Sequence, residues 1–146
     1  MGAHPWFYFV PYAEDIAKGL EALREREFRA GRYHPSEPFP GFPIDPRRSP
    51  GSKHSSIEAA RAAASANGTR SILDMTRISP RPDFGAVAPL DDAELMDLFG
   101  TVKPTRADIE TSEAIFEQIE RGQGIYIVVY ENNEPSQVYF AGYSYD

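Results

Sequence analysis

The longest uninterrupted apolar run in the chain covers residues 125–130 and reads Ile-Tyr-Ile-Val-Val-Tyr. Its length, its β-branched and aromatic residues, and the preceding Gly122 and Gly124 are typical of a strand buried on both faces. The polar residues 131–135 predict a turn, and the apolar residues 137–143 predict a return strand. The run therefore predicts a β-hairpin at the centre of a sheet, which the rest of the chain must cover or extend.

A second aromatic run, from Trp6 to Val10, predicts another strand. Pro5 and Pro11 flank this run and favour a position at the edge of the sheet, because proline cannot donate to a β-ladder. Apolar spacing and capping residues predict the other elements. These are helices at about 13–30, 55–67 and 91–99, a strand at 84–90, and a strand-like segment at 71–75.

A long amphipathic helix is expected between Pro104 and Gly122. At about 100° per residue, four large apolar side chains share one face of this helix. They are Ile109, Ile115, Phe116 and Ile119. Four glutamates share an adjoining face, namely Glu110, Glu113, Glu117 and Glu120. The spacing therefore predicts one helix with a buried side and an acidic side.

These elements predict an α+β fold in one domain over residues 1–146. We expect a mixed or mainly antiparallel sheet of about five strands covered by helices, closing with the long helix and the hairpin. Residues 33–55 interrupt this pattern, since six of the thirteen prolines lie between Pro35 and Pro50. This segment is expected to be irregular and to lie on the surface of the domain.

Composition excludes several classes of function. The absence of cysteine removes disulfides, thiolate catalysis and Cys-based zinc sites. The net charge of −7 argues against nucleic-acid binding. No signal peptide and no membrane-spanning run are visible, so a cytoplasmic protein without membrane contact is expected. The charge is uneven, because residues 24–53 carry a net charge of +3.

The sequence contains no nucleophile, phosphate-binding or metal-ligand motif. His4, His34 and His54 do not have metal-ligand spacing. No cofactor and no metal are expected, and a non-enzymatic protein is favoured.

The first functional hypothesis is a protein-binding module for a basic partner, of which an immunity-like or antitoxin-like inhibitor is one version. Acidic side chains steer the association of a basic partner, and tyrosine is enriched at protein interfaces. The candidate partner-binding residues are Glu110, Glu113, Glu117, Glu120, Tyr139 and Tyr143.

The alternative hypothesis is a small enzyme or a binder of an anionic ligand, built around the Pro-rich segment. His34 and His54 flank this segment and would meet if it folds back as a loop. Histidine could transfer protons near neutral pH, and arginines could hold the anion. The candidate ligand-binding residues are Arg32, Tyr33, His34, Arg47, Arg48 and His54.

Overall fold

A computed structural model describes residues 3–36, 42 and 44–145 of the chain. It contains a five-stranded sheet, four α-helices and three short 3₁₀ helices, which confirms the predicted α+β fold. The strands are β1 (Pro5–Pro11), β2 (Arg77–Ile78), β3 (Ala86–Pro89), β4 (Gly124–Glu131) and β5 (Glu134–Tyr143). The α-helices are α1 (Ile16–Ala30), α2 (Ile57–Ala64), α3 (Asp92–Phe99) and α4 (Arg106–Glu110). The 3₁₀ helices are η1 (Ser65–Asn67), η2 (Ile72–Asp74) and η3 (Ile115–Gln118).

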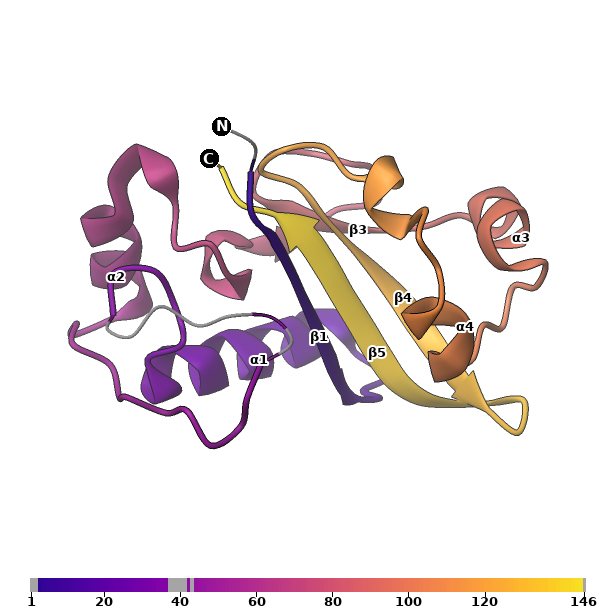
Figure 1. Cartoon of the computed structure of the whole chain (residues 1–146), viewed down its shortest axis with the longest axis horizontal. Helices are drawn as coiled ribbons and strands as arrows, with labels where there is room; N and C mark the ends of the chain where they lie inside the picture. Colours follow the sequence, from indigo (N-terminus) through magenta and orange to yellow (C-terminus); the bar gives the residue numbers. More distant parts are fainter. Residues whose placement is uncertain (1–2, 37–41, 43, 146) are drawn as a thin grey trace.

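The sheet is mixed and has the strand order β1-β5-β4-β3-β2. The β4–β5 hairpin lies at its centre, as the apolar run predicts, with β1 antiparallel to β5 and β3 parallel to β4. The predicted edge position of β1 is also confirmed. Figure 1 shows β1 lying along β5 with α1 behind it, and α4 in front of the hairpin.

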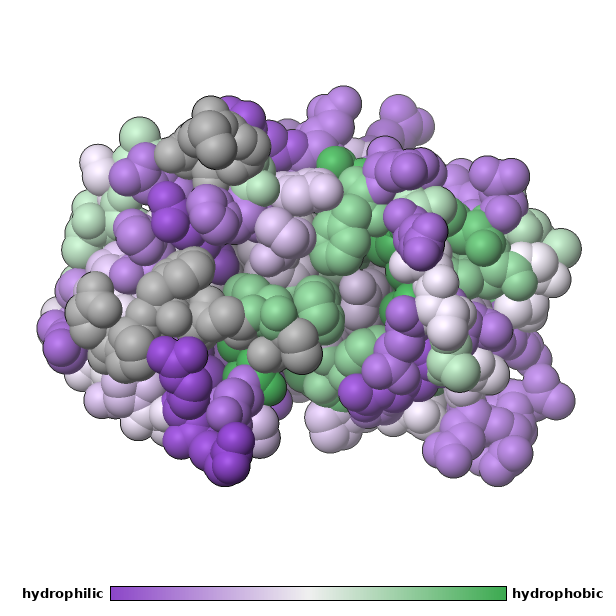
Figure 2. Space-filling model, viewed as in Figure 1, coloured by the Kyte–Doolittle hydropathy of each residue, from purple (hydrophilic) through white to green (hydrophobic). Residues whose placement is uncertain are grey.

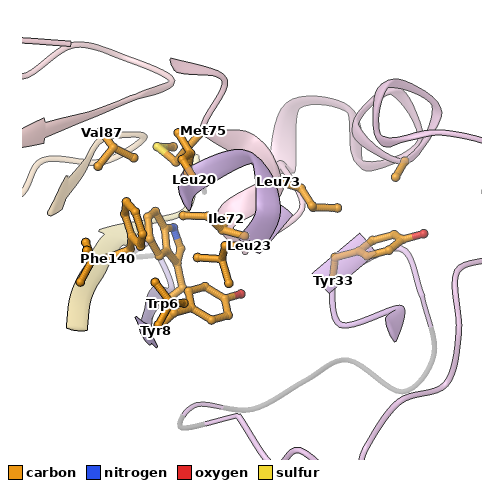
Figure 3. Packing of buried hydrophobic residues seen from close by; sticks show 13 residues of the cluster. Trp6, Tyr8, Leu20, Leu23, Tyr33, Ile72, Leu73, Met75, Val87 and Phe140 are labelled. Atoms are coloured by element: carbon orange, nitrogen blue, oxygen red, sulfur yellow. The ribbon is translucent and has the colours of Figure 1, made fainter. Parts of the chain in front are cut away.

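Each face of the sheet has its own hydrophobic core. One core packs the sheet against α1, α2 and η2, and Figure 3 shows Trp6, Tyr8 and Phe140 next to Leu20 and Leu23 in this layer. The other core packs Ile127 and Val129 under residues of α3, α4 and η3. Both residues are almost fully buried, at 2% and 1% exposure, so β4 is the central core strand.

The predicted long helix between Pro104 and Gly122 is wrong. Helix α4 ends at Glu110, a turn follows, and η3 forms a separate short helix before the chain becomes extended at Ile119. The Thr111 hydroxyl donates to the Ala107 carbonyl at 2.8 Å. Such back-bonding by a poor helix former weakens a helix at that point. Ile109, Ile115 and Ile119 are buried as expected and Phe116 is half-buried, but they lie in α4, in η3 and in the extended residue after it rather than in one helix.

The strand-like segment 71–75 forms the 3₁₀ helix η2 instead. The Ser71 hydroxyl accepts from the Leu73 N–H at 3.2 Å, and the Asp74 carboxylate accepts from the Thr69 N–H at 2.8 Å. These local bonds satisfy backbone groups that a strand would pair with a neighbour.

Candidate functional site

A groove with a volume of about 650 Å³ crosses the front of β1 and reaches around its edge. It lies between α4 and η3 on one side and residues 44–46 with the end of α1 on the other. Figure 2 shows hydrophobic surface across the middle of this face, with hydrophilic residues to either side. Grooves of this size and mixed lining are typical of ligand sites.

The floor and one wall of the groove are apolar. Phe7 and Phe9 point from β1 to the same face as Tyr139 of β5, with ring centroids 6.3 and 4.7 Å from the Tyr139 ring. Phe116 of η3 closes the wall, with its ring centroid 6.5 Å from that of Phe7. Burial raises the pKa of Tyr139, so this tyrosine acts in the groove as a neutral aromatic residue.

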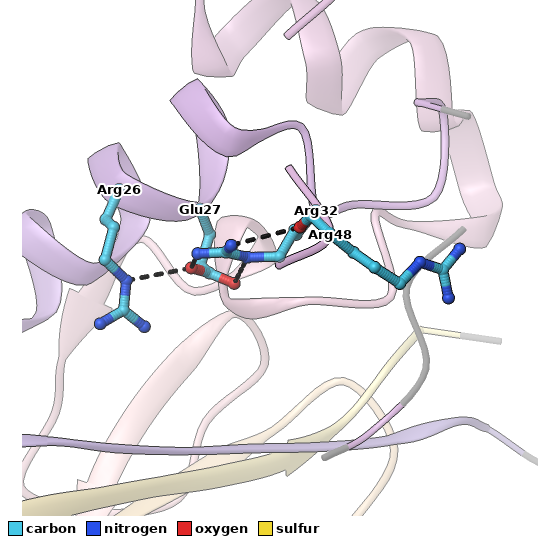
Figure 4. Close-up of polar contacts among 4 residues, drawn as sticks. All are labelled: Arg26, Glu27, Arg32 and Arg48. Atoms are coloured by element: carbon cyan, nitrogen blue, oxygen red, sulfur yellow. Dashed lines mark hydrogen bonds and ion pairs between the residues drawn. The ribbon is translucent and has the colours of Figure 1, made fainter. Parts of the chain in front are cut away.

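The cationic end of the groove is organised by Glu27, whose side chain is fully buried. Arg32 Nε and Nη2 donate to its two carboxylate oxygens at 3.0 and 2.6 Å, and Arg26 Nε donates at 3.0 Å (Figure 4). Arg32 Nη1 also donates to the Arg48 carbonyl at 3.3 Å. Hydrogen bonding to Glu27 raises the pKa of Arg32, so Arg32 stays protonated, and the Glu27 carboxylate offsets its charge within the protein.

Arg26 is held differently from Arg32. Only its Nε contacts Glu27, and its side chain is 50% exposed. Figure 4 shows both Nη atoms pointing away from the carboxylate, and no hydrogen bond joins them to another described residue. A guanidinium with two Nη donors free is suited to a carboxylate or phosphate. Glu27 therefore orients Arg26 and leaves it available to a ligand.

Tyr8 adds a buried polar group beside this cationic end. Its side chain lines the groove and is 4% exposed. The Ile72 backbone lies near the Tyr8 hydroxyl, but no hydrogen bond of normal geometry reaches this hydroxyl from the described residues. Burial, followed by the nearby Glu27 carboxylate, raises the pKa of Tyr8 well above its usual range. The hydroxyl is therefore a neutral donor.

A second arginine stands at the opposite wall. The Arg106 guanidinium lies 4.1 Å from the centroid of the Phe9 ring, a cation–π contact. Its Nε is 3.4 Å from the Glu110 carboxylate, four residues further along α4. Glu110 pairs with Arg106 alone, whereas the Glu27 that Arg26 contacts is already paired with Arg32, so Arg26 is the better anion donor of the two.

Most of the residues that the ligand hypothesis grouped together lie outside the groove, although Tyr33 contacts His54 and Arg32 contacts Arg48. Among the described residues that line the groove, Arg32 is the one member of that set. Tyr33 is fully buried, and its hydroxyl is 2.7 Å from His54 Nδ1. His34 is half-buried, and its N–H donates to the Thr69 carbonyl at 2.8 Å. Arg47 and Arg48 are exposed, and Arg47 pairs with Asp45. The expected pocket between the two histidines is therefore not the groove found here.

The candidate partner-binding residues do not form one surface either. Glu110, Glu113, Glu117 and Glu120 are all exposed, but they do not share one helix face because the long helix does not form. Tyr139 is buried, whereas Tyr143 is half-buried with its ring 5.4 Å from Phe116. Glu110 and Tyr139 line the groove.

Sequence reasoning missed Arg26, Arg106, Phe7 and Phe9 as site residues. Cations in the last turns of a helix suit the helix dipole, and aromatic residues are common in strands, so neither group stands out as a site in the sequence. Glu25 and Glu27 alternate with arginines in this stretch, and the sequence does not show that Glu27 is buried whereas Glu25 is exposed.

No family model, curated protein or solved structure matched this chain in the three comparisons. In the part of the chain that the structure describes, no helix has both the length and the apolar character needed to span a membrane. Across the same residues, no group of three or more His, Asp or Glu side chains is placed to hold a metal ion.

Proposed function

We propose that this chain is a binding protein whose groove takes a ligand with an apolar body and a carboxylate or phosphate group. The apolar body would lie on Phe7, Phe9 and Tyr139, and the anion would meet the two Nη atoms of Arg26. The observation that carries the proposal is the Arg26 guanidinium, which Glu27 orients by one hydrogen bond and leaves open in the same groove, across the edge of β1 from the aromatic floor. Pre-organised donors lower the entropic cost of binding.

The test is calorimetric titration with 4-phenylbutanoate and with its uncharged amide. The carboxylate should bind more tightly, and Arg26→Gln should weaken its binding by about tenfold, since a charge-assisted hydrogen bond contributes about 1.5–3 kcal/mol. The amide should bind wild type and Arg26→Gln alike.

Arg29→Gln is the matched control. Arg29 lies one turn further along α1, pairs with the exposed Glu25 and does not line the groove. Its loss should leave binding unchanged. Equal weakening by both variants would attribute the effect to the general charge of α1 and would contradict the proposed anion site.

Association with a basic protein is a second candidate, favoured by the distribution of charge. Residues 91–120 contain nine acidic and two basic residues, a net charge of −7 that equals that of the whole chain. No salt bridge joins Glu113, Glu117 or Glu120 to another described residue. Association rates with lysozyme and cytochrome c as basic probes should fall with salt and with the double variant Glu113→Lys/Glu117→Lys. Rates unaffected by either change would remove this candidate.

A further inference from the structure

The hydrogen-bond register of β1 shows which of its backbone groups face the edge of the sheet. The Ser144 N–H donates to the His4 carbonyl, and the Tyr12 N–H donates to the Ser136 carbonyl. Bonded pairs alternate along an antiparallel ladder, so the even-numbered residues of β1 bond to β5. The backbone N–H and C=O groups of the odd-numbered residues therefore point away from the sheet.

Proline occupies the first and last of these outward positions. Pro5 and Pro11 have no N–H to offer, whereas Phe7 and Phe9 between them each present one. No hydrogen bond joins these two N–H groups to a described residue outside the strand. Prolines on an edge strand limit uncontrolled pairing with other chains. Here they leave two outward N–H donors, those of Phe7 and Phe9, which together are called the donor window.

The groove reaches the donor window from both faces of the sheet. Phe7 and Phe9 line it from the front face, whereas Tyr8 and Arg26 line it from the α1 side. The Phe42 ring is 5.8 Å from Phe7 and 5.5 Å from Tyr8. Because the Phe7 and Tyr8 side chains point to opposite faces, the Phe42 ring must lie over the edge itself. An apolar side chain already occupies this position.

We propose that the ligand is an extended peptide that adds to the edge of β1, pairing its backbone with Phe7 and Phe9 and alternating apolar with acidic side chains. This inference rests on the proposed function and assigns its ligand class. Strand addition places successive side chains on opposite faces of the sheet. Apolar side chains would therefore enter the aromatic side of the groove, and acidic side chains would reach Arg26. One peptide side chain would take the place of the Phe42 ring.

The probe is a blocked five-residue peptide of alternating valine and glutamate, titrated into the full chain by calorimetry. We expect it to bind and to compete with 4-phenylbutanoate. Methylation of the backbone nitrogens that face β1 should weaken its binding by about tenfold, because each removes a hydrogen bond. Methylation of the outward-facing nitrogens should have little effect. Equal effects of the two methylated peptides would overturn strand pairing.

Variants of the protein give the reciprocal test. Phe9→Ala and Phe9→Pro both remove the ring, but only Phe9→Pro removes the outward N–H, at a position equivalent to Pro5 and Pro11. Phe9→Pro should bind the peptide several-fold more weakly than Phe9→Ala, while both bind 4-phenylbutanoate alike. Phe42→Ala should bind the peptide more tightly than wild type, since no ring has to be displaced. Equal peptide affinity of Phe9→Pro and Phe9→Ala, with both folded by circular dichroism, would overturn the inference.

The outcomes separate this inference from the proposed function. If 4-phenylbutanoate binds through Arg26 and the peptide does not bind, the strand-addition inference fails and the anion site remains. If neither probe binds, both fail.

Discussion

Glu27 and Arg32 form a two-point ion pair inside the protein, with Arg32 Nε and Nη2 at 3.0 and 2.6 Å from the two Glu27 carboxylate oxygens. The Glu27 side chain is completely buried, and that of Arg32 is 10% exposed. The pair joins the last turns of α1 to Arg32, just before the Pro-rich segment, and the Glu27 Oε2 atom that accepts from Arg32 Nη2 also accepts from Arg26 Nε. The orientation of Arg26 at the cationic end of the groove therefore depends on the buried Glu27–Arg32 pair.

Glu27→Gln should be strongly destabilising. The substitution leaves the buried Arg32 charge without its counter-ion, which costs about 3–5 kcal/mol in the free energy of unfolding. Urea denaturation followed by circular dichroism measures the loss. Glu25→Gln is the control, because the Glu25–Arg29 pair is exposed and such pairs contribute about 0–1 kcal/mol. Similar losses for the two variants would show that burial of the Glu27–Arg32 pair does not matter.

Two glycine-to-alanine substitutions should have opposite effects. At Gly142, a Cβ atom would lie 2.3 Å from the Trp6 ring and 2.5 Å from the Gln123 carbonyl, so alanine must displace the core. Gly142→Ala should destabilise by about 1–3 kcal/mol or more. At Gly19 in α1 the Cβ meets only an ordinary contact at 3.6 Å, and alanine should stabilise by about 0.5–1 kcal/mol. Thermal melts of both variants test the sign, and destabilisation by Gly19→Ala would contradict the geometry of α1.

The contribution of Asp74 to the free energy of unfolding should decrease as the pH rises and its carboxyl loses the proton. Burial raises the pKa of this carboxyl, so the folded protein holds the proton more tightly than the unfolded chain does. Its favourable contribution is complete below the unfolded pKa of about 3.9 and is lost as pH rises through the raised pKa of the folded state. Asparagine has no such proton to lose. The stability of Asp74→Asn relative to wild type should therefore improve between about pH 3 and pH 7.

The stability of Asp45→Asn relative to wild type should change with pH in the opposite direction. Hydrogen bonds from Arg47 lower the pKa of the half-buried Asp45, whose stabilising contribution is present at neutral pH and is lost as pH falls through the lowered value. The relative stability of Asp45→Asn should therefore decline slightly over the pH range in which Asp74→Asn improves. Urea titrations at several pH values measure both slopes, and slopes of the same sign would contradict this assignment.

Ile127→Ala tests the central position of β4. Ile127 is 2% exposed within the core formed by α3, α4 and η3 over the sheet, so its truncation should cost about 2–5 kcal/mol. Val128→Ala, at a half-buried site on the other face, should cost less. A loss below about 1 kcal/mol for Ile127→Ala in denaturant melts would make the strand peripheral.

Local pattern predicted four of the five strands, because the residues of those strands indicate how deeply each is buried, but it did not predict β2. The run from Ile125 to Tyr130 requires burial, and Pro5 and Pro11 permit only an edge. The segment from Ile109 to Ile119 shows where the pattern fails. Its apolar spacing fits one helix or two short helices joined by a turn, and the back-bonding hydroxyl of Thr111 favours the second. Periodicity predicted which side chains are buried, but not the backbone that buries them.

The groove could not be predicted from the sequence because its lining residues are far apart in the chain. Phe9, Arg26, Ile44, Arg106 and Tyr139 come from five separate segments and meet only through the order of the sheet. The open guanidinium of Arg26 results from the burial of Glu27, and nothing local to Arg26 distinguishes it from Arg29. The charge asymmetry did indicate a basic region, but it could not show which arginine remains available.

The most direct test of the binding groove is a titration of the ¹⁵N-labelled chain with 4-phenylbutanoate, followed by two-dimensional NMR. The largest saturable shifts should fall on the backbone amides of Phe7, Phe9 and Ser112 and on the Arg26 side-chain Nε–H, while the amides of α2 remain unchanged. Arg26→Gln should require a higher ligand concentration for the same shifts. Saturable shifts confined to α2 or α3, or none at Phe7 and Phe9 at any concentration, would contradict a ligand site at the edge of β1.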